Sequence, residues 1–308
     1  MHTMVENHTQ VTWFCLLGLT EQEELKGIFF VLFLLIYSVT VMGNLGMITL
    51  IHAEPQLHTP IYLFLGVLSF IDSSFSMVDT PRLLESFLIS SQSIFFASCV
   101  VQMALMTLHG TAECLLLAIM AYDQFTAICH PLLCHTIMSQ HLCVLLVVTS
   151  YTVSVANSAL LTGCIFKLPY CGPNVINQYF CGIPPVLHLA CVDTTEGETI
   201  IFSSCVLLIL FTTTIILVSY AYILVPICRM RSLQAQSKAL STCASHLTII
   251  CFFYSTITFT YAQPSSHNSM EHNKVMSVFY TVIIPMLNSL IYSLRNRDIK
   301  YALKRRCL

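Results

Sequence analysis

The stretch GIFFVLFLLIYSVTVMGNLGMITLI, residues 27–51, decides the class of this protein. It contains no Asp, Glu, Lys or Arg. As a helix rising about 1.5 Å per residue, it is long enough to cross the roughly 30 Å hydrocarbon core of a bilayer. Residues 142–166 and 199–228 are equally free of these charges. Lipid offers the backbone no hydrogen-bond partners, so runs of this length predict membrane-spanning helices rather than barrel strands.

Four further runs are long and nearly free of charge: 60–80, 95–122, 239–262 and 275–294. Only Asp72, Asp79 and Glu113 interrupt them. The whole chain is 56% hydrophobic and 9% charged, a composition that excludes a water-soluble protein. We therefore predict an all-α membrane protein, a bundle of seven transmembrane helices. A net charge of -2 provides no basic surface for nucleic acid.

The basic residues set the expected orientation. Nine of the 13 Lys and Arg residues fall on one side of the membrane: Arg229, Arg231, Lys238, Arg295, Arg297, Lys300, Lys304, Arg305 and Arg306. This bias predicts a cytoplasmic tail at 295–308, an extracellular tail at 1–26 and a long extracellular loop at 167–198. The outer tail then carries the sequon Asn7-His8-Thr9, a predicted glycosylation site. No appended domain is evident, so residues 1–308 form one bundle with its loops.

Cysteines on the expected outer face could attach the long loop to the bundle. Cys99 lies at the top of the third span, and Cys171, Cys181 and Cys191 lie in the loop. Four cysteines allow three pairings. A bridge from Cys99 to the loop would fold the loop over the mouth of the bundle as a lid, but these spacings do not choose the pairing.

Five strings, in order along nearly the whole chain, resemble the signature strings of the vertebrate olfactory receptors, which are rhodopsin-like receptors coupled to G proteins. They are LHTPIYLFLGVLSFID (57–72), MAYDQFTAICHPL (120–132), SY (219–220), KALSTCASHL (238–247) and PMLNSLIYSLRN (285–296). The resemblance implies disulfides Cys99–Cys181 and Cys171–Cys191. It also implies a receptor rather than an enzyme.

The implied function is odorant detection at the plasma membrane of olfactory sensory neurons. The expected partners are a small neutral odorant, a stimulatory G protein that raises cyclic AMP, and membrane lipid. Residues Ile299, Ala302 and Leu303 of the tail RNRDIKYALKRRCL predict a short amphipathic helix on the inner leaflet, because basic residues occupy its other faces.

Five residues of the third span recur at helical spacing and predict one wall of a ligand cavity: Met103, Met106, Thr107, Gly110 and Thr111. They match the positions that line the family's odorant cavity, and the resemblance adds Ser204, Cys205, Leu208, Ile257, Thr258, Tyr261, Val278 and Thr281. Helix packing is the alternative for each residue alone. We expect no charged side chain to point into this cavity, which favours neutral volatile ligands.

Carboxylates inside a membrane are costly, so Asp72 and Glu113 predict a functional site. They match acidic positions that face each other beneath the family's cavity. Three alternatives remain open: they share a sodium ion, share a proton, or hydrogen-bond to Ser, Asn288 and water. No other metal or cofactor is expected. Asp79 is expected near the outer end of its helix within reach of water, and His246 as a surface hydrogen-bonding group.

The resemblance ties coupling and activation to Asp123, Gln124, Phe125, Tyr220, Lys238, Ser289 and Tyr292. This chain departs from the family pattern at Gln124, Phe125 and Ser289, where the family has Arg, Tyr and Pro. Gln124 lacks the charge of Arg, and Ser289 lacks the kink of Pro. We expect a straighter seventh helix that is less ready to swing Tyr292 inward.

The alternative function is therefore a receptor that binds odorant with weak or no signalling. A proton-coupled transporter using Asp72 and Glu113 is disfavoured, because we find no internal repeat and seven spans do not divide evenly.

Overall fold

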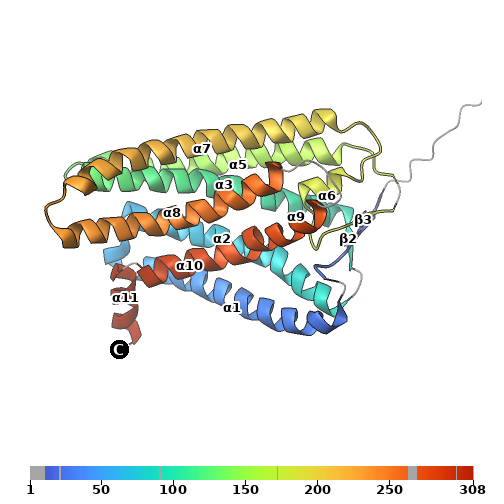
Figure 1. Cartoon of the computed structure of the whole chain (residues 1–308), viewed down its shortest axis with the longest axis horizontal. Coiled ribbons are helices and arrows are strands. Elements are labelled where there is room, and N and C mark those ends of the chain that lie inside the picture. The colour runs from blue at the N-terminus through green and yellow to red at the C-terminus, as the bar shows by residue number, and fades with distance from the viewer. Residues whose placement is uncertain are drawn as a thin grey trace, which may run out of the picture.

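The computed structural model describes residues 11–20, 22–89, 92–171, 173–262, 269–295 and 297–307. Within these ranges, seven helical segments are long and apolar enough to cross a membrane. Six are α1 (Glu23–Ala53), α2 (Pro60–Leu88), α3 (Phe96–Cys129), α5 (Gln140–Phe166), α7 (Thr195–Arg229) and α8 (Leu233–Ala262). The seventh runs through α9 (Ser269–Val278), η2 (Phe279–Ile283) and α10 (Ile284–Arg295). They lie side by side along the long axis of the molecule, which confirms the predicted bundle (Figure 1).

Several helices extend beyond the charge-free runs in the sequence. α2 continues past Pro81 to Leu88 and includes Arg82, and α3 continues through Asp123 to Cys129. Charges end an apolar run but do not end a helix, because backbone hydrogen bonds continue wherever the chain keeps helical geometry.

The seventh segment is not a uniform α-helix. Its middle turn, η2, is π-helical and ends two residues before Pro285. A π turn inserts one extra residue, which rotates the side chains that follow relative to a regular helix. The expected straight seventh helix is therefore replaced by one with an internal irregularity.

Four short helices occupy the ends of the bundle: η1 (Pro55–Leu57), α4 (Cys134–Ile137), α6 (Ile183–Leu187) and α11 (Arg297–Cys307). In α11, Ile299 and Ala302 are buried, whereas Leu303 is exposed. Arg305 Nη1 lies 3.9 Å from Glu54 Oε2 at the end of α1. The helix therefore docks on the bundle through one apolar face and keeps basic residues outside.

A three-stranded sheet at the opposite end of the molecule was not predicted. β1 (Trp13–Leu16) lies between β2 (Gln92–Phe95), which is antiparallel to it, and β3 (Val175–Ile176), which is parallel. Side chains alternate along β1, so Phe14 and Leu16 are buried while Trp13 is exposed. The sheet joins the amino-terminal segment to the long loop. It lies near α6, at the end far from α11 (Figure 1).

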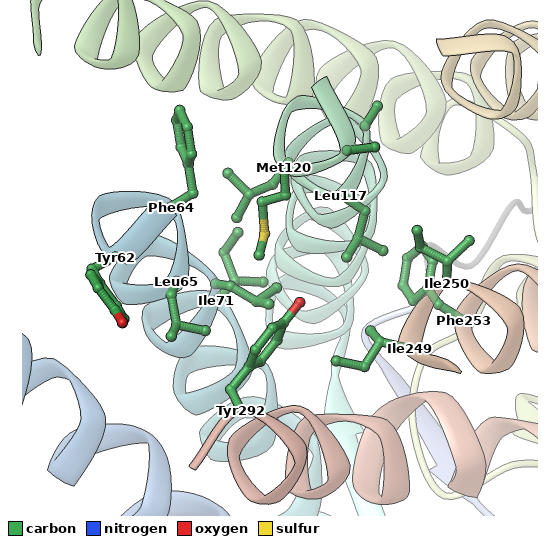
Figure 2. Close-up of a cluster of buried hydrophobic side chains, with 14 of the residues drawn as sticks. Tyr62, Phe64, Leu65, Ile71, Leu117, Met120, Ile249, Ile250, Phe253 and Tyr292 are labelled. Carbon is green, nitrogen blue, oxygen red and sulfur yellow. The ribbon is translucent and has the colours of Figure 1, made fainter. Parts of the chain in front are cut away.

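The main hydrophobic core lies in the half of the bundle nearer α11. Figure 2 shows Leu65 and Ile71 on α2 facing Leu117 and Met120 on α3, with residues of α8 and α10 closing the cluster. Interdigitation of side chains from four helices fixes the relative positions of the polar groups that lie among them.

Candidate functional site

The long loop is covalently attached to the bundle as a lid. A disulfide joins Cys99, in the first turn of α3, to Cys181, and a second joins Cys171 to Cys191 within the loop. These are the pairings that the resemblance implied. Cys99 and Cys181 are fully buried, so the lid is packed against the bundle as well as tethered to it.

Gln102 reinforces this attachment one turn below Cys99. Its Oε1 accepts from the backbone N–H of Cys181 at 3.1 Å, and its Nε2 donates to Asp79 Oδ1 at 2.9 Å. Asp79 is fully buried. The expectation that water reaches this carboxylate was wrong, because Gln102 and the lid cover it.

The lid also contacts the seventh helix. Gln178 Nε2 donates to Ser277 Oγ at 2.9 Å, and the Tyr179 hydroxyl lies 2.8 Å from Thr281 Oγ1. Burial raises the pKa of Tyr179, with the Thr281 hydrogen bond opposing this effect. The phenol therefore stays neutral and bridges the lid to the seventh helix.

A cavity of about 130 Å³ lies beneath the lid, mainly between α3, α5, α7 and α8, with Phe75 of α2 and Tyr280 of η2 also in its wall. The structure brings eight predicted residues to its wall: Met103, Met106, Thr107, Gly110, Thr111, Cys205, Leu208 and Ile257. The wall is mostly apolar. Its shape and chemistry suit a small, largely apolar molecule.

Other predicted lining residues lie elsewhere. Thr258 is exposed on α8, because consecutive helical residues are about 100° apart and Ile257 faces the cavity. Val278 packs against Tyr179 and Phe180 of the lid, and Thr281 bonds to Tyr179. The π turn rotates this region, so that Tyr280 lines the cavity instead. Ser204 does not line the cavity but donates a hydrogen bond to Asn157, which does. The side chain of Tyr261 lies outside the described residues. Asn7 lies outside them as well.

Several lining residues were missed by sequence reasoning, among them Phe75, Cys114, Asn157, Leu161, Ile209, Phe253, Tyr280 and the lid residues Gln178 and Phe180–Pro185. A signal existed for two of them, since Asn157 and Leu161 are four apart on one face of α5. Glu113 also lines the cavity. The expectation of no charged side chain there was wrong, because Glu113 lies three residues after Gly110 and shares its face of α3.

Asp72, Glu113 and Asn288 form a buried polar cluster at the base of the cavity. Asn288 Nδ2 lies 3.1 Å from each oxygen of Asp72 and 3.3 Å from Glu113 Oε1. Asn288 Oδ1 is buried, and no hydrogen bond to it is found in the described part of the chain. The amide donor partly offsets the repulsion between two carboxylates in a medium of low dielectric constant.

A neutral hydrogen-bonded relay connects α3, α7 and α8 toward the end of the bundle opposite the lid, the coupling end, which is named for the coupling residues that the resemblance implied there. The Tyr220 hydroxyl on α7 lies 2.8 Å from Gln124 Oε1 on α3, and 2.8 Å from His246 Nδ1 on α8. A phenol has one proton, so when it donates to Gln124 it accepts from the imidazole. His246 is fully buried. The prediction that it is a surface group was wrong, because α3 and α7 pack over it.

Asp123 and Phe125, which the resemblance also ties to coupling, flank Gln124 on α3. Asp123 is buried beside Gln124, and among the described residues it forms no ion pair. Phe125 packs its ring near Tyr222 and His130. The side chain of Lys238 lies outside the described residues.

Ser289 and Tyr292 occupy the inner face of α10. Ser289 Oγ donates to Met286 O at 2.9 Å, and a Cβ added to Gly43 would lie 2.9 Å from that Oγ, so α1 and α10 touch closely here. The Tyr292 ring already points between α2 and α3 (Figure 2), and it is 9% exposed. The ring is therefore already turned inward in this conformation.

Comparison with known proteins agrees with this arrangement. The family described as "Olfactory receptor" matches residues 33–308. Olfactory receptor 5P55 of Mus musculus is 50% identical over 300 residues, and Olfactory receptor 5AR1 of Homo sapiens is 49% identical over 300 residues. Each alignment covers 97% of both chains. The chain belongs to the olfactory receptor family, a family of multi-pass membrane receptors that are not enzymes.

Proposed function

We propose that this receptor binds small, neutral, mostly apolar volatile molecules in the cavity beneath the lid. The observation that carries the proposal is a cavity of about 130 Å³ lined by helices of the bundle and by a disulfide-tied loop. An apolar cavity of roughly 150 Å³ in another protein binds benzene. The ligand therefore belongs to this size class.

Charge in the wall supports neutrality of the ligand. No Lys or Arg occurs among the described lining residues, so a carboxylate would lose its hydration without gaining a counter-ion. Glu113 contacts the cavity but is engaged by Asn288. Binding an amine there would require breaking into this buried cluster.

Family membership supports a G-protein-coupled output. The receptor activates a stimulatory G protein and raises cyclic AMP, with its carboxyl terminus in the cytoplasm and its lid and glycosylated Asn7 outside. Its site of action is the plasma membrane of olfactory sensory neurons. The basic residues exposed on α11 fit the anionic inner leaflet.

The strength of this output is reduced in this chain. The Gln124–Tyr220–His246 relay contains no charge-assisted bond, and such bonds are roughly twice as strong as neutral ones. An activation equilibrium shifts only through interactions that differ between its states. Weak signalling at normal ligand occupancy is therefore the second part of the proposal.

A sodium ion would complete the cluster beneath the cavity. Asp72 and Glu113 supply hard oxygen ligands of the kind that alkali and alkaline-earth cations prefer, and the Asn288 amide would turn over to offer Oδ1 to the ion in place of Nδ2. The ion would neutralise part of the buried negative charge. A proton shared by Asp72 and Glu113 would also neutralise part of this charge.

A cyclic AMP assay on cells that display the receptor at the surface tests the proposed function. A broad panel of neutral volatiles should include at least one that raises cyclic AMP, with cells lacking the receptor as the control. A response confined to charged ligands, or no binding of any neutral volatile, would contradict the proposal.

A further inference from the structure

The amide of Asn157 is fixed in one orientation by its neighbours. The Thr111 hydroxyl donates to the backbone oxygen of Thr107 at 2.8 Å, which leaves only lone pairs facing Asn157. The amide nitrogen must therefore face Thr111, and it donates to Oγ1 at 2.9 Å. Asn157 Oδ1 then faces Ser204 on α7 and accepts from its hydroxyl at 2.6 Å.

Within this network, one hydrogen-bond donor has no partner: the second N–H of the Asn157 amide. The protons of Thr111 and Ser204 are used within the network, and the Thr107 hydroxyl donates to Met103 O at 2.8 Å. Asn157 Nδ2 carries two hydrogens, and its bond to Thr111 is the one it makes within the described part of the chain. Asn157 also lines the cavity. The cavity wall thus presents a neutral N–H donor held in place by three helices.

We propose that Asn157 makes the cavity selective for neutral ligands that carry a hydrogen-bond acceptor, above all the carbonyl oxygen of a ketone, aldehyde or ester. This inference rests on the proposed function, because it assigns a ligand class to the same cavity. The carbonyl accepts from Asn157 Nδ2, and the hydrocarbon part of the ligand contacts the apolar wall. A ligand without an acceptor leaves the N–H dry and unpaired, which disfavours its binding.

One other amide lines the cavity and serves as the comparison. Gln178 lies in the lid, where its Nε2 donates to Ser277 and its Oε1 accepts from the backbone N–H of Tyr179 at 3.3 Å. Its role is to hold the lid to the seventh helix. Replacing Gln178 should therefore weaken all ligands alike, whereas replacing Asn157 should weaken acceptor ligands selectively.

The test measures ligand-induced thermal stabilisation of the purified full-length receptor, a readout that does not require G-protein coupling. The probes are 2-hexanone, 2-hexanol and n-hexane, which match in length and differ in polar group. Wild type should reach half-maximal stabilisation with 2-hexanone at about tenfold lower aqueous concentration than with n-hexane, after correction for their different hydrophobicity.

Two variants remove the donor in different ways. Asn157→Leu replaces the amide by an apolar group of similar size. Asn157→Ser keeps a polar side chain, but Ser150 and Ser154 on the same helix donate to the backbone one turn earlier, so the new hydroxyl should do the same. Both variants should abolish the preference for 2-hexanone, and n-hexane should bind at least as well as to wild type, because it no longer leaves an N–H unpaired. If Asn157→Leu does not fold, Asn157→Ser carries the comparison.

Three results would overturn the inference: equal corrected affinity for 2-hexanone and n-hexane in wild type, a preference that survives in the Asn157 variants, or a preference that disappears in Gln178→Met instead. In each of these cases ligands still bind, so the proposed function stands. If none of the three probes stabilises wild type, the inference is contradicted, and the neutral-ligand proposal is judged on the broad panel of volatiles.

Discussion

The two ends of the molecule are held together by different kinds of interaction. At the lid end, two disulfides, a sheet and the buried bonds of Gln102, Gln178 and Tyr179 fix the loop over the cavity. At the coupling end, the Tyr220 hydroxyl bridges Gln124 and His246 through neutral hydrogen bonds. A neutral hydrogen bond contributes only about 1 kcal/mol net. Substitutions can therefore change output while recognition stays intact.

Breaking the covalent tie should have the largest effect. Cys181→Ser releases the lid from Cys99 and leaves a reactive thiol in an oxidising compartment, so surface expression should fall at least tenfold. Flow cytometry of intact cells with an amino-terminal tag measures this. Cys251→Ser is the matched control, because Cys251 is exposed and forms no disulfide. Normal surface level and ligand response in Cys181→Ser would show that the disulfide does not maintain the lid.

Filling the cavity should leave the lid intact but remove recognition. A Cβ added to Gly110 meets nothing within 4 Å, so Gly110→Leu projects side-chain atoms into a cavity of about 130 Å³. Agonist potency should fall at least tenfold at unchanged surface expression, measured by cyclic AMP dose-response curves. Gly163→Leu is the control, since it also adds a side chain in open space but away from the cavity. Unchanged potency for every agonist in Gly110→Leu would place the ligand site elsewhere.

Removing the Tyr220 hydroxyl should destabilise the coupling end, with a smaller effect than the two changes above. Tyr220→Phe deprives both Gln124 Oε1 and His246 Nδ1 of their bond, at a cost of about 1–3 kcal/mol in the free energy of unfolding. Thermal denaturation of the purified receptor should show a lower midpoint. Tyr222→Phe, at a position that is 62% exposed, should leave it unchanged. Equal midpoints for the two variants would mean that the relay contributes nothing to stability.

The polar cluster between the two ends should give the smallest effect. If Asp72, Glu113 and Asn288 hold sodium, replacing sodium chloride by choline chloride should shift wild-type dose-response curves severalfold. Asp72→Asn removes one charged ligand and should abolish that shift. Coincident wild-type curves in the two salts would exclude the shared ion and favour a shared proton or the Asn288 hydrogen bonds alone.

The helical frame was predictable from sequence because a membrane span needs a long apolar run, and residues 27–51 show one without ambiguity. The sheet was not predictable, because β1 has four residues and β3 has two. Strands this short do not show a pattern of alternating apolar and polar residues. Burial of Asp79 and His246 also escaped prediction. Their neighbours Gln102 and Tyr220 are distant in sequence, and only the packed bundle brings them together.

The cavity was predictable in part for a similar reason. Spacing along α3 identified its wall correctly, since a regular helix repeats every 3.6 residues. The resemblance added Val278 and Thr281 of the seventh helix, but the cavity is lined there by Tyr280, within the π turn at Phe279–Ile283. Asn157 was missed because a single polar residue in an apolar span does not reveal that Thr111 and Ser204 bond to it.

The most direct test of separable recognition and output compares cyclic AMP produced per occupied receptor in wild type and in Gln124→Arg with Ser289→Pro. The Pro is tolerable, because Asn44 Nδ2 already donates to Pro285 O at 3.1 Å, the carbonyl that residue 289 would otherwise reach in an α-helix. At saturating agonist and equal surface expression, the double variant should give a several-fold higher maximal response with little change in the half-maximal concentration. An unchanged maximal response per occupied receptor would contradict the claim that these two residues limit output.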